Sequence, residues 1–219
     1  MNGYLEKLMN LPRTLRFNVK VFGFKEGLKM PIFITRNIKV GKLHKGCISI
    51  SGLKKRFMIE LGTGGSEGVP NQRGYFCVEK NAHIHFAGKA YFAQGCVIRV
   101  DGGRLEIGSN FNANKNCTLW CNERIAIGEN VLLGYQVYLR DDDGHSIMTD
   151  GVLAEKSKSI VIGNHVWCSA NVSILKGVVI ADDSVVGYNS CVFGQFEESN
   201  VLLGGYPAKV LKKNIQWKK

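Results

Sequence analysis

The 219-residue chain has no apolar run long enough to cross a membrane. A transmembrane helix needs about 18 or more apolar residues in succession, so the sequence predicts none. The N-terminal segment MNGYLEKLMNLPRTLRF also lacks the uninterrupted apolar stretch and the small-residue cleavage site of a signal peptide. Both absences predict a cytoplasmic protein.

Several motifs of common enzyme and metal-binding classes are missing as well. The chain has no phosphate-binding Walker loop and no nucleophile elbow. It has no His-x₄-His pair, and Cys117 and Cys121 have no second cysteine pair to complete a metal site. The seven cysteines are an odd number in a chain too long for a disulfide-stapled miniprotein, so we expect reduced thiols. No metal is predicted.

Acidic residues are scarce in the first third of the chain. Residues 1–75 hold 14 basic and 4 acidic side chains, whereas the remainder holds 15 and 14, so nearly all of the +11 net charge lies in the first third. Such a field attracts phosphates, acidic glycans or an anionic membrane leaflet, or it is simply a solvated basic surface. No nucleic-acid-binding motif accompanies it, so no nucleic-acid partner is expected.

Within this basic third, residues 11–34 mix basic and aromatic side chains. Two interpretations stay open. The segment either lies on a membrane surface with its lysines directed to the headgroups, or packs its apolar side on the rest of the chain or a neighbouring subunit.

A repeat of six residues organises the rest of the chain. Each sixth residue is aliphatic or small, the next is often glycine, serine or alanine, and the fifth is small or branched. A period of six fits neither a helix nor one alternating sheet, but it fits a three-sided coil with a short strand on each side. The aliphatic positions are Ile107, Ala113, Leu119, Ile127, Leu133, Leu139, Ile162, Cys168, Ile174, Ile180, Val186 and Val192.

The repeat is interrupted once. Successive rounds open with the similar segments IHFAG (84–88), LEIGS (105–109), IAIGE (125–129) and IVIGN (160–164). The last spacing is much the longest, which predicts an inserted loop at about residues 145–159.

The order of IGNHVWCSANVSILKGVVI, VVGYNS and GGYPAKVLKK resembles the hexapeptide-repeat acyltransferases over about residues 76–213. The resemblance implies an all-β, left-handed parallel β-helix, with acetyl-CoA as co-substrate and a homotrimer whose active sites lie between subunits. We divide the chain into a basic, aromatic extension (1–40), the β-helix with its loop (41–200) and a basic tail (201–219).

The resemblance also identifies candidate catalytic residues. His145, in LRDDDGHSI where the long insertion begins, matches the family's catalytic histidine. Attack of a hydroxyl on a thioester requires loss of the hydroxyl proton, and imidazole changes protonation near neutral pH, so His145 is expected to be the general base. Asn114 matches a pocket asparagine that fixes the acceptor hydroxyl or the acetyl oxygen, with a turn asparagine as the alternative.

Acceptor-binding candidates surround the histidine. Asp142 and Asp143 are expected to orient the imidazole or hold the acceptor, although an aspartate run is also typical of a polar turn. Asn122 stands where relatives often carry a carboxylate, so its role is less defined by the resemblance.

The cofactor-binding candidates are spread over the later repeats. Trp167 and Ala170 match positions beside the thioester and pantetheine, and a backbone N–H near Ala170 is a candidate donor to the thioester oxygen. Gly187 and Tyr188 follow one coil later, although Tyr188 replaces a small residue of the family pattern. Lys209 and Lys212 match tail positions that meet the phosphates of CoA.

Together these features predict an acetyl-CoA-dependent O-acetyltransferase. It would act on a sugar hydroxyl in the biosynthesis of a surface polysaccharide such as capsule or O-antigen, by direct transfer, in the cytoplasm or peripherally at the inner membrane face. One alternative is N-acetylation of an amino sugar or nucleotide sugar. From another class of protein, the alternative is a non-catalytic trimeric β-helix that serves as an assembly module.

Overall fold

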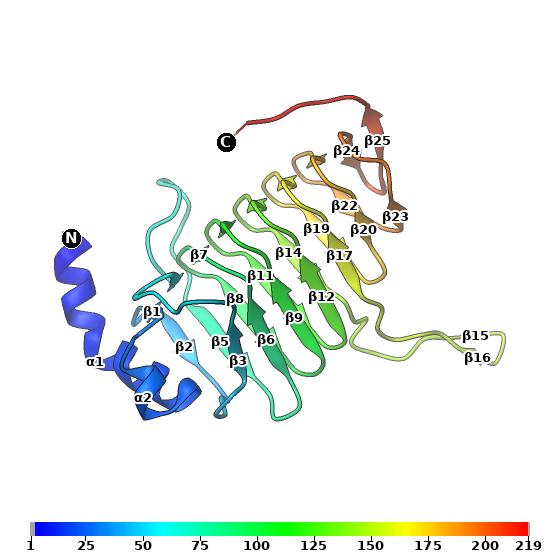
Figure 1. Cartoon of the computed structure of the whole chain (residues 1–219). Coiled ribbons are helices and arrows are strands. Elements are labelled where there is room, and N and C mark those ends of the chain that lie inside the picture. The colour runs from blue at the N-terminus through cyan, green and yellow to red at the C-terminus, as the bar shows by residue number, and fades with distance from the viewer. Residues whose placement is uncertain (1–2, 219) are drawn as a thin grey trace.

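The computed structural model describes residues 3–218, whose strands stack into a three-sided parallel β-helix (Figure 1). Each coil contributes one short strand to each of three sheets, so a strand within the stack pairs in parallel with strands from the coils on either side. The left-handed β-helix predicted from the sequence is confirmed.

The strands of all three sheets are stacked along the axis of the β-helix. We number the sheets 1 to 3 in the order in which their first strands occur in the chain. Sheet 1 contains β1 (Ile32–Ile34), β4 (Ile59–Leu61), β7 (Ala90–Phe92), β10 (Phe111–Ala113), β13 (Leu132–Leu133), β18 (Trp167–Cys168), β21 (Val185–Val186), β24 (Leu202–Gly205) and β25 (Ala208–Lys212). Sheet 2 contains β2 (Ile38–Val40), β5 (Gly74–Val78), β8 (Val97–Val100), β11 (Thr118–Cys121), β14 (Tyr138–Arg140), β19 (Ser173–Leu175) and β22 (Cys191–Val192). Sheet 3 contains β3 (Ile48–Ile50), β6 (His83–Phe86), β9 (Arg104–Ile107), β12 (Arg124–Ile127), β17 (Ile160–Ile162), β20 (Val179–Ile180) and β23 (Gln195–Phe196).

The six-residue repeat fills the interior of the β-helix. All twelve repeat positions given above are buried, none with more than 4% of its surface exposed. Their side chains stack coil upon coil into one continuous hydrophobic core. Burial of each large aliphatic side chain contributes about 1.5–3 kcal/mol, so no single coil is stable alone and the stack is cooperative.

Where a glycine follows the aliphatic position, it has a steric cause at the corner. A Cβ on Gly108 would lie 2.3 Å from the carbonyl oxygen of Gly128, and one on Gly128 would lie 2.6 Å from the carbonyl carbon of Gly163. These glycines therefore allow successive coils to approach closely at the corner that joins sheet 3 to sheet 1.

The predicted insertion leaves the stack without disturbing it. Ile125 and Ile127 of β12 pair with Ile160 and Ile162 of β17, although 35 residues separate the partners. The intervening chain forms a projecting hairpin of β15 (Met148–Thr149) and β16 (Val152–Leu153), which extends away from the body (Figure 1).

The first helix covers the N-terminal end of the stack. Helix α1 (Gly3–Phe22) precedes the short α2 (Phe24–Gly27), and it packs on β1 with Phe17 and Val21 buried. Asn18 of α1 donates to the carbonyl of Ile32 (2.6 Å) and accepts from its N–H (3.1 Å). Thr14 makes the same pair of contacts with Ile34. Helical side chains thus satisfy the outer edge of sheet 1.

Replacement of Asn18 by alanine should destabilise the fold by about 2 kcal/mol, because both polar groups of Ile32 would stay buried without a partner. Asn18 is fully buried, so little water can reach them. The free energy of unfolding from urea titration measures the effect. Leu8→Ala on the exposed side of the same helix is the control and should change stability by less than about 0.5 kcal/mol. Equal losses in the two variants would contradict the capping role of Asn18.

Two segments differ from the division of the chain made on sequence. Strands β1 and β2 already belong to the stack, although they lie before residue 41, because their isoleucines face the same core as the later repeats. At the other end, β24 continues sheet 1 and β25 returns antiparallel beside it, so residues 202–212 of the tail are also part of the sheet.

Candidate active site

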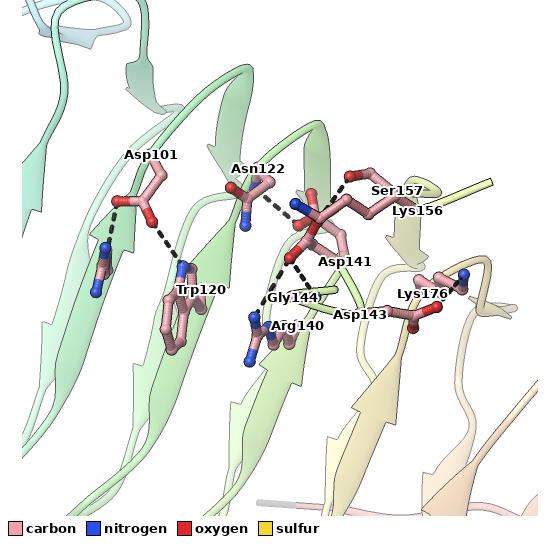
Figure 2. A network of polar contacts seen from close by, with 12 residues as sticks. Asp101, Trp120, Asn122, Arg140, Asp141, Asp143, Gly144, Lys156, Ser157 and Lys176 are labelled. Atoms are coloured by element: carbon pink, nitrogen blue, oxygen red, sulfur yellow. Dashed lines mark hydrogen bonds and ion pairs between the residues drawn. The ribbon is translucent and has the colours of Figure 1, made fainter. Parts of the chain in front are cut away.

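The corner that joins sheet 2 to sheet 3 is fixed by a buried carboxylate. Asp141 directly follows β14 and has no exposed surface. It accepts a hydrogen bond from the backbone N–H of Asn122 in the coil below (2.7 Å; Figure 2). It also accepts from the N–H groups of Glu123 (2.9 Å) and Arg124 (2.8 Å). Asp141 therefore fixes the point at which the chain leaves the β-helix.

The next carboxylate closes the base of the inserted loop. Asp142 is 8% exposed, and it accepts from the N–H of Gly144 (2.6 Å), the hydroxyl of Ser157 (3.1 Å) and the guanidinium of Arg140 (3.3 Å). Burial by itself would raise the pKa of Asp142, but these hydrogen bonds outweigh it and lower the pKa below its usual value. The side chain stays ionised and holds the two ends of the loop together.

The third carboxylate ties the loop to the following coil. Asp143 forms an ion pair with Lys176 of the turn after β19. Its N–H donates to the carbonyl of Lys156 (3.0 Å), and the N–H of Lys158 donates to the carbonyl of Asp141 (2.9 Å). The three aspartates thus form a clamp at the base of the projecting hairpin (Figure 2).

His145 lies just beyond this clamp. It is exposed, and within residues 3–218 its side chain forms no hydrogen bond or ion pair. Its ring nitrogens are therefore available to a substrate, while Gly144 beside it is held in place through Asp142. Asn122, half-buried on the same corner one coil earlier, uses its backbone N–H for Asp141. The arrangement can present a base to an incoming hydroxyl.

Asn114 lies at a different corner, the one that joins sheet 1 to sheet 2. It follows β10, whereas His145 follows β14, so a single chain does not bring the two side chains together. The Asn114 amide donates to the hydroxyl of Ser66 (2.6 Å) and its oxygen accepts from the N–H of Ser66 (3.0 Å). The loop of residues 62–73 therefore covers Asn114.

Most of the cofactor-binding candidates share that corner with Asn114. Ala170 follows β18, and Gly187 and Tyr188 follow β21, so all three lie in turns from sheet 1 to sheet 2. The N–H of Ala170 donates no hydrogen bond within the described chain. Tyr188 is 62% exposed, and its hydroxyl accepts from Asn171 (2.8 Å). The structure thus aligns these candidates in one column, which we call the corner column.

The remaining candidates border this column. Trp167 lies half-buried on β18 of sheet 1. Lys209 and Lys212 are exposed on β25, at the C-terminal end of the stack, and neither is in an ion pair within residues 3–218. The corner column and the lysines of β25 thus offer complementary groups to an elongated ligand with an anionic end.

A stack of one tryptophan and two arginines on sheet 2 was not predicted by any pattern in the sequence. Trp120 stands between Arg99 and Arg140, whose guanidinium carbons lie 4.4 and 4.1 Å from the centre of its ring system. The indole N–H donates to Asp101 (2.9 Å), which also binds Arg99 (Figure 2). Strand alternation places these side chains outward, but the register that stacks them depends on the coil lengths.

The C-terminal tail provides a second unforeseen contact. Trp217 stacks on His165 with ring centres 4.1 Å apart and donates to the His165 carbonyl (2.9 Å). It bounds a groove of about 800 Å³ over sheet 1 that Lys55, Lys89 and Tyr91 also line. Because these residues are far apart in sequence, no local pattern could have joined them.

Within residues 3–218, no group of three or more His, Cys, Asp or Glu side chains is placed to hold a metal ion. All seven cysteines are free and buried. Burial, with a smaller contribution from the neighbouring Asp141 charge, raises the pKa of the Cys121 thiol far above its usual value. The thiols therefore pack as small core side chains.

Comparison with known proteins identifies several O-acetyltransferases as relatives. The chain is 30% identical over 135 residues to WbbJ of Escherichia coli K12, assigned as a lipopolysaccharide biosynthesis O-acetyltransferase, covering 56% of this chain and 68% of WbbJ. It is 36% identical over 115 residues to the galactoside O-acetyltransferase of the same organism (51% and 55% covered). The polysialic acid O-acetyltransferase of Neisseria meningitidis is 38% identical over 106 residues (48% and 49% covered).

The matches cover parts of these proteins. The chain spans about two thirds of WbbJ and about half of the other two. Among solved structures, a variant of the N-acyltransferase AntD from Bacillus cereus, in complex with dTDP and coenzyme A, has the same fold. Its TM-score is 0.52 at 14% identity, with 83% of this chain and 80% of that chain covered. No protein-family profile matches the chain.

Proposed function

Because the chain belongs to the hexapeptide-repeat acyltransferase family, we propose that it transfers an acetyl group from acetyl-CoA to a sugar hydroxyl of a surface polysaccharide. The observation that carries the proposal is His145, exposed and unpaired beside a rigid clamp. The glycan substrates in the names of the relatives support a sugar acceptor such as a capsule or O-antigen unit.

His145 would act as the general base of a direct transfer. Its imidazole takes the proton of the acceptor hydroxyl while that oxygen forms a bond to the carbonyl carbon of the thioester. The carbon–sulfur bond breaks, and the imidazolium returns the proton to the departing CoA thiolate. The free N–H of Ala170 is a candidate donor to the carbonyl oxygen as negative charge develops there.

The corner column fits CoA as the donor substrate. The unpaired N–H of Ala170 suits a carbonyl of the pantetheine arm, and Lys209 and Lys212 suit the phosphates at the other end. Trp167 adds an apolar surface next to the column. Of the acceptor candidates, Asn122 keeps a free side-chain amide, whereas Asp142 and Asp143 act on the acceptor through the loop that they hold.

A complete site would need two copies of the chain, because His145 and Asn114 lie at different corners of one. In a ring of three copies, the corner between sheets 2 and 3 of one chain meets the corner between sheets 1 and 2 of the next. Sheet 2, with its outward-facing, half-buried Arg99, Trp120 and Arg140, then faces the three-fold axis. Aromatic and arginine side chains are typical of interfaces. We therefore propose a homotrimer with shared sites.

Subunit mixing tests the shared site. His145→Ala and Asn114→Ala should each be nearly inactive, but unfolding and reassembling them together should restore about a quarter of the wild-type activity. In every mixed trimer one of the three interfaces combines an intact His145 with an intact Asn114. A mixture as inactive as its components would place the two residues in the same site of one chain, or in none.

The transfer itself is tested by thiol release from acetyl-CoA with a panel of sugars and amino sugars. Acceptor-dependent release is expected, with a hydroxyl of a glycan as the best acceptor. Release only with amino sugars would identify an N-acetyltransferase. Absence of release, together with no retention on immobilised CoA, would favour a non-catalytic assembly module.

Charge removal at the tail tests the orientation of CoA. The double variant Lys209→Ala/Lys212→Ala should raise KM for acetyl-CoA by about tenfold at low salt with kcat nearly unchanged, because two phosphate contacts are lost far from the reacting carbonyl. Lys213→Ala, which pairs with Glu198 instead, is the matched control. An unchanged KM in the double variant would mean that CoA does not reach β25.

No helix among residues 3–218 is both long enough and apolar enough to span a bilayer. The buried free thiols support a reducing compartment, and we place the protein in the cytoplasm on that ground.

A further inference from the structure

Three large apolar side chains that follow α1 are exposed at the N-terminal end of the β-helix, in addition to the exposed Leu5, Leu8, Met9 and Leu15 of α1 itself. Phe24 is 73% exposed, Leu28 is 50% and Leu53 is 75%. Phe24 and Leu28 are four residues apart along α2 and its last turn, so they lie on one side. The loop after β3 that carries Leu53 contacts α2 through the ion pair of Lys54 with Glu26 (3.0 Å). We call Phe24, Leu28 and Leu53 the basal patch.

The two chain segments that carry the basal patch are strongly basic. Residues 20–30 and 45–56 contain seven basic side chains and one acidic side chain. That acid, Glu26, is held by Lys29 (2.7 Å) and Lys54 (3.0 Å), whose hydrogen bonds lower its pKa to about 2. The other basic residues form no ion pair within the described chain; they are Lys20, Lys25, Lys45, Lys55 and Arg56.

Within residues 11–34, the structure distinguishes the exposed Phe24 and Leu28 from the apolar residues of α1 that are buried in the fold. Phe17 and Val21 of α1 are buried against the first coils, so this side of the helix serves the fold, whereas Leu8, Met9 and Leu15 on its other sides are exposed. Phe24 and Leu28 come after α1 and point away from the core. An anionic bilayer has charged phosphates at its surface and apolar acyl chains beneath them. An apolar patch whose chain segments also carry unpaired lysines is complementary to both layers.

We propose that the basal patch docks the protein on an anionic lipid bilayer. Phe24, Leu28 and Leu53 enter the boundary between headgroups and acyl chains, while the lysines around them lie among the lipid phosphates. This inference is independent of the acetyl transfer proposed above. In a trimer with a three-fold axis parallel to the stack, three patches share one end, and simultaneous contact strengthens a weak single patch.

Vesicle sedimentation of the full chain tests the proposal. The vesicles are pure phosphatidylcholine, or equal parts phosphatidylcholine and phosphatidylglycerol. We expect binding to the anionic vesicles that weakens as salt is raised. Phe24→Ser/Leu28→Ser/Leu53→Ser should lower the partition coefficient by about tenfold or more. The matched control, Met148→Ser/Val152→Ser/Leu153→Ser on the hairpin, removes three equally exposed apolar side chains and should bind as the wild type does.

A second variant separates charge from apolar contact and does not depend on the first one folding. Lys25→Gln/Lys45→Gln/Lys55→Gln removes three unpaired charges from the surface and should also weaken binding about tenfold at low salt. Binding by both patch variants at the wild-type level would overturn the proposal. It would also be overturned if the wild type ignored the anionic vesicles, or if the serine variant only changed the oligomeric state and so marked the patch as a contact between copies.

Discussion

Replacement of His145 by alanine should lower kcat by about 10²–10⁴-fold, the usual contribution of a positioned general base. The loss should leave KM for acetyl-CoA nearly unchanged, because His145 is proposed to take the proton of the acceptor hydroxyl and not to bind CoA. Stability should also stay within about 0.5 kcal/mol of the wild type, since the side chain is exposed and forms no hydrogen bond or ion pair within residues 3–218. Steady-state thiol release with the best acceptor measures the effect.

The matched control for this experiment is His85→Ala. His85 lies on the outer face of sheet 3, where it contacts Ser49 and Ser51, far along the stack from the loop. It should retain wild-type activity. If His145→Ala kept most of its activity, the base would have to be another group, and the proposed mechanism would be wrong.

Removal of the Asp141 carboxylate should have the largest effect on stability. Asp141→Ala leaves three backbone N–H groups without their acceptor, at about 1–3 kcal/mol each, so a loss of at least about 3 kcal/mol is expected. For a chain of this size, that corresponds to a fall in Tm of about 6–12 °C. Activity should fall by more than the loss of folded protein explains, because Asp141 fixes the point from which the His145 loop departs.

The neighbouring Asp143→Asn is the control. It removes one partly exposed ion pair, with Lys176, which is worth at most about 1 kcal/mol. Thermal unfolding of both variants, followed at one protein concentration, gives the comparison. A similar small loss in the two would mean that water or a rearranged turn replaces the Asp141 carboxylate, and the clamp would not be the main support of the loop.

The sequence predicted the β-helix well wherever the repeat is regular. Ile162, Ile174 and Val186 identify the interior because a period of six leaves each sixth residue at an equivalent place in successive coils. The first coils were harder to recognise, because the loops at 51–58 and 62–73 interrupt the period around β4. The sequence pattern therefore does not distinguish β1 and β2 from the extension, although their isoleucines face the same core.

The site was predictable to a lesser degree. The resemblance identified His145 and Asn114, and the repeat placed them on different coils. It could not show that Ser66 occupies the amide of Asn114, since a contact across 48 residues depends on how the loop at 62–73 folds back. The aspartates show the same limit. Three consecutive aspartates cannot be distinguished by sequence, yet Asp141 and Asp142 are buried while Asp143 is not.

Both ends of the stack carry devices against strand addition. A parallel stack is open-ended, and an unpaired outer strand is a template for another molecule. Asn18 and Thr14 occupy that template at β1, and β25 reverses direction at the far end with lysines along its edge. A chain that lacks residues 1–30 would leave β1 uncovered, and we expect such molecules to associate head to tail into filaments. Lys209 and Lys212 would thus have two roles. They would bind the donor substrate, and their positive charges would hinder the end of one molecule from pairing with the sheet of another.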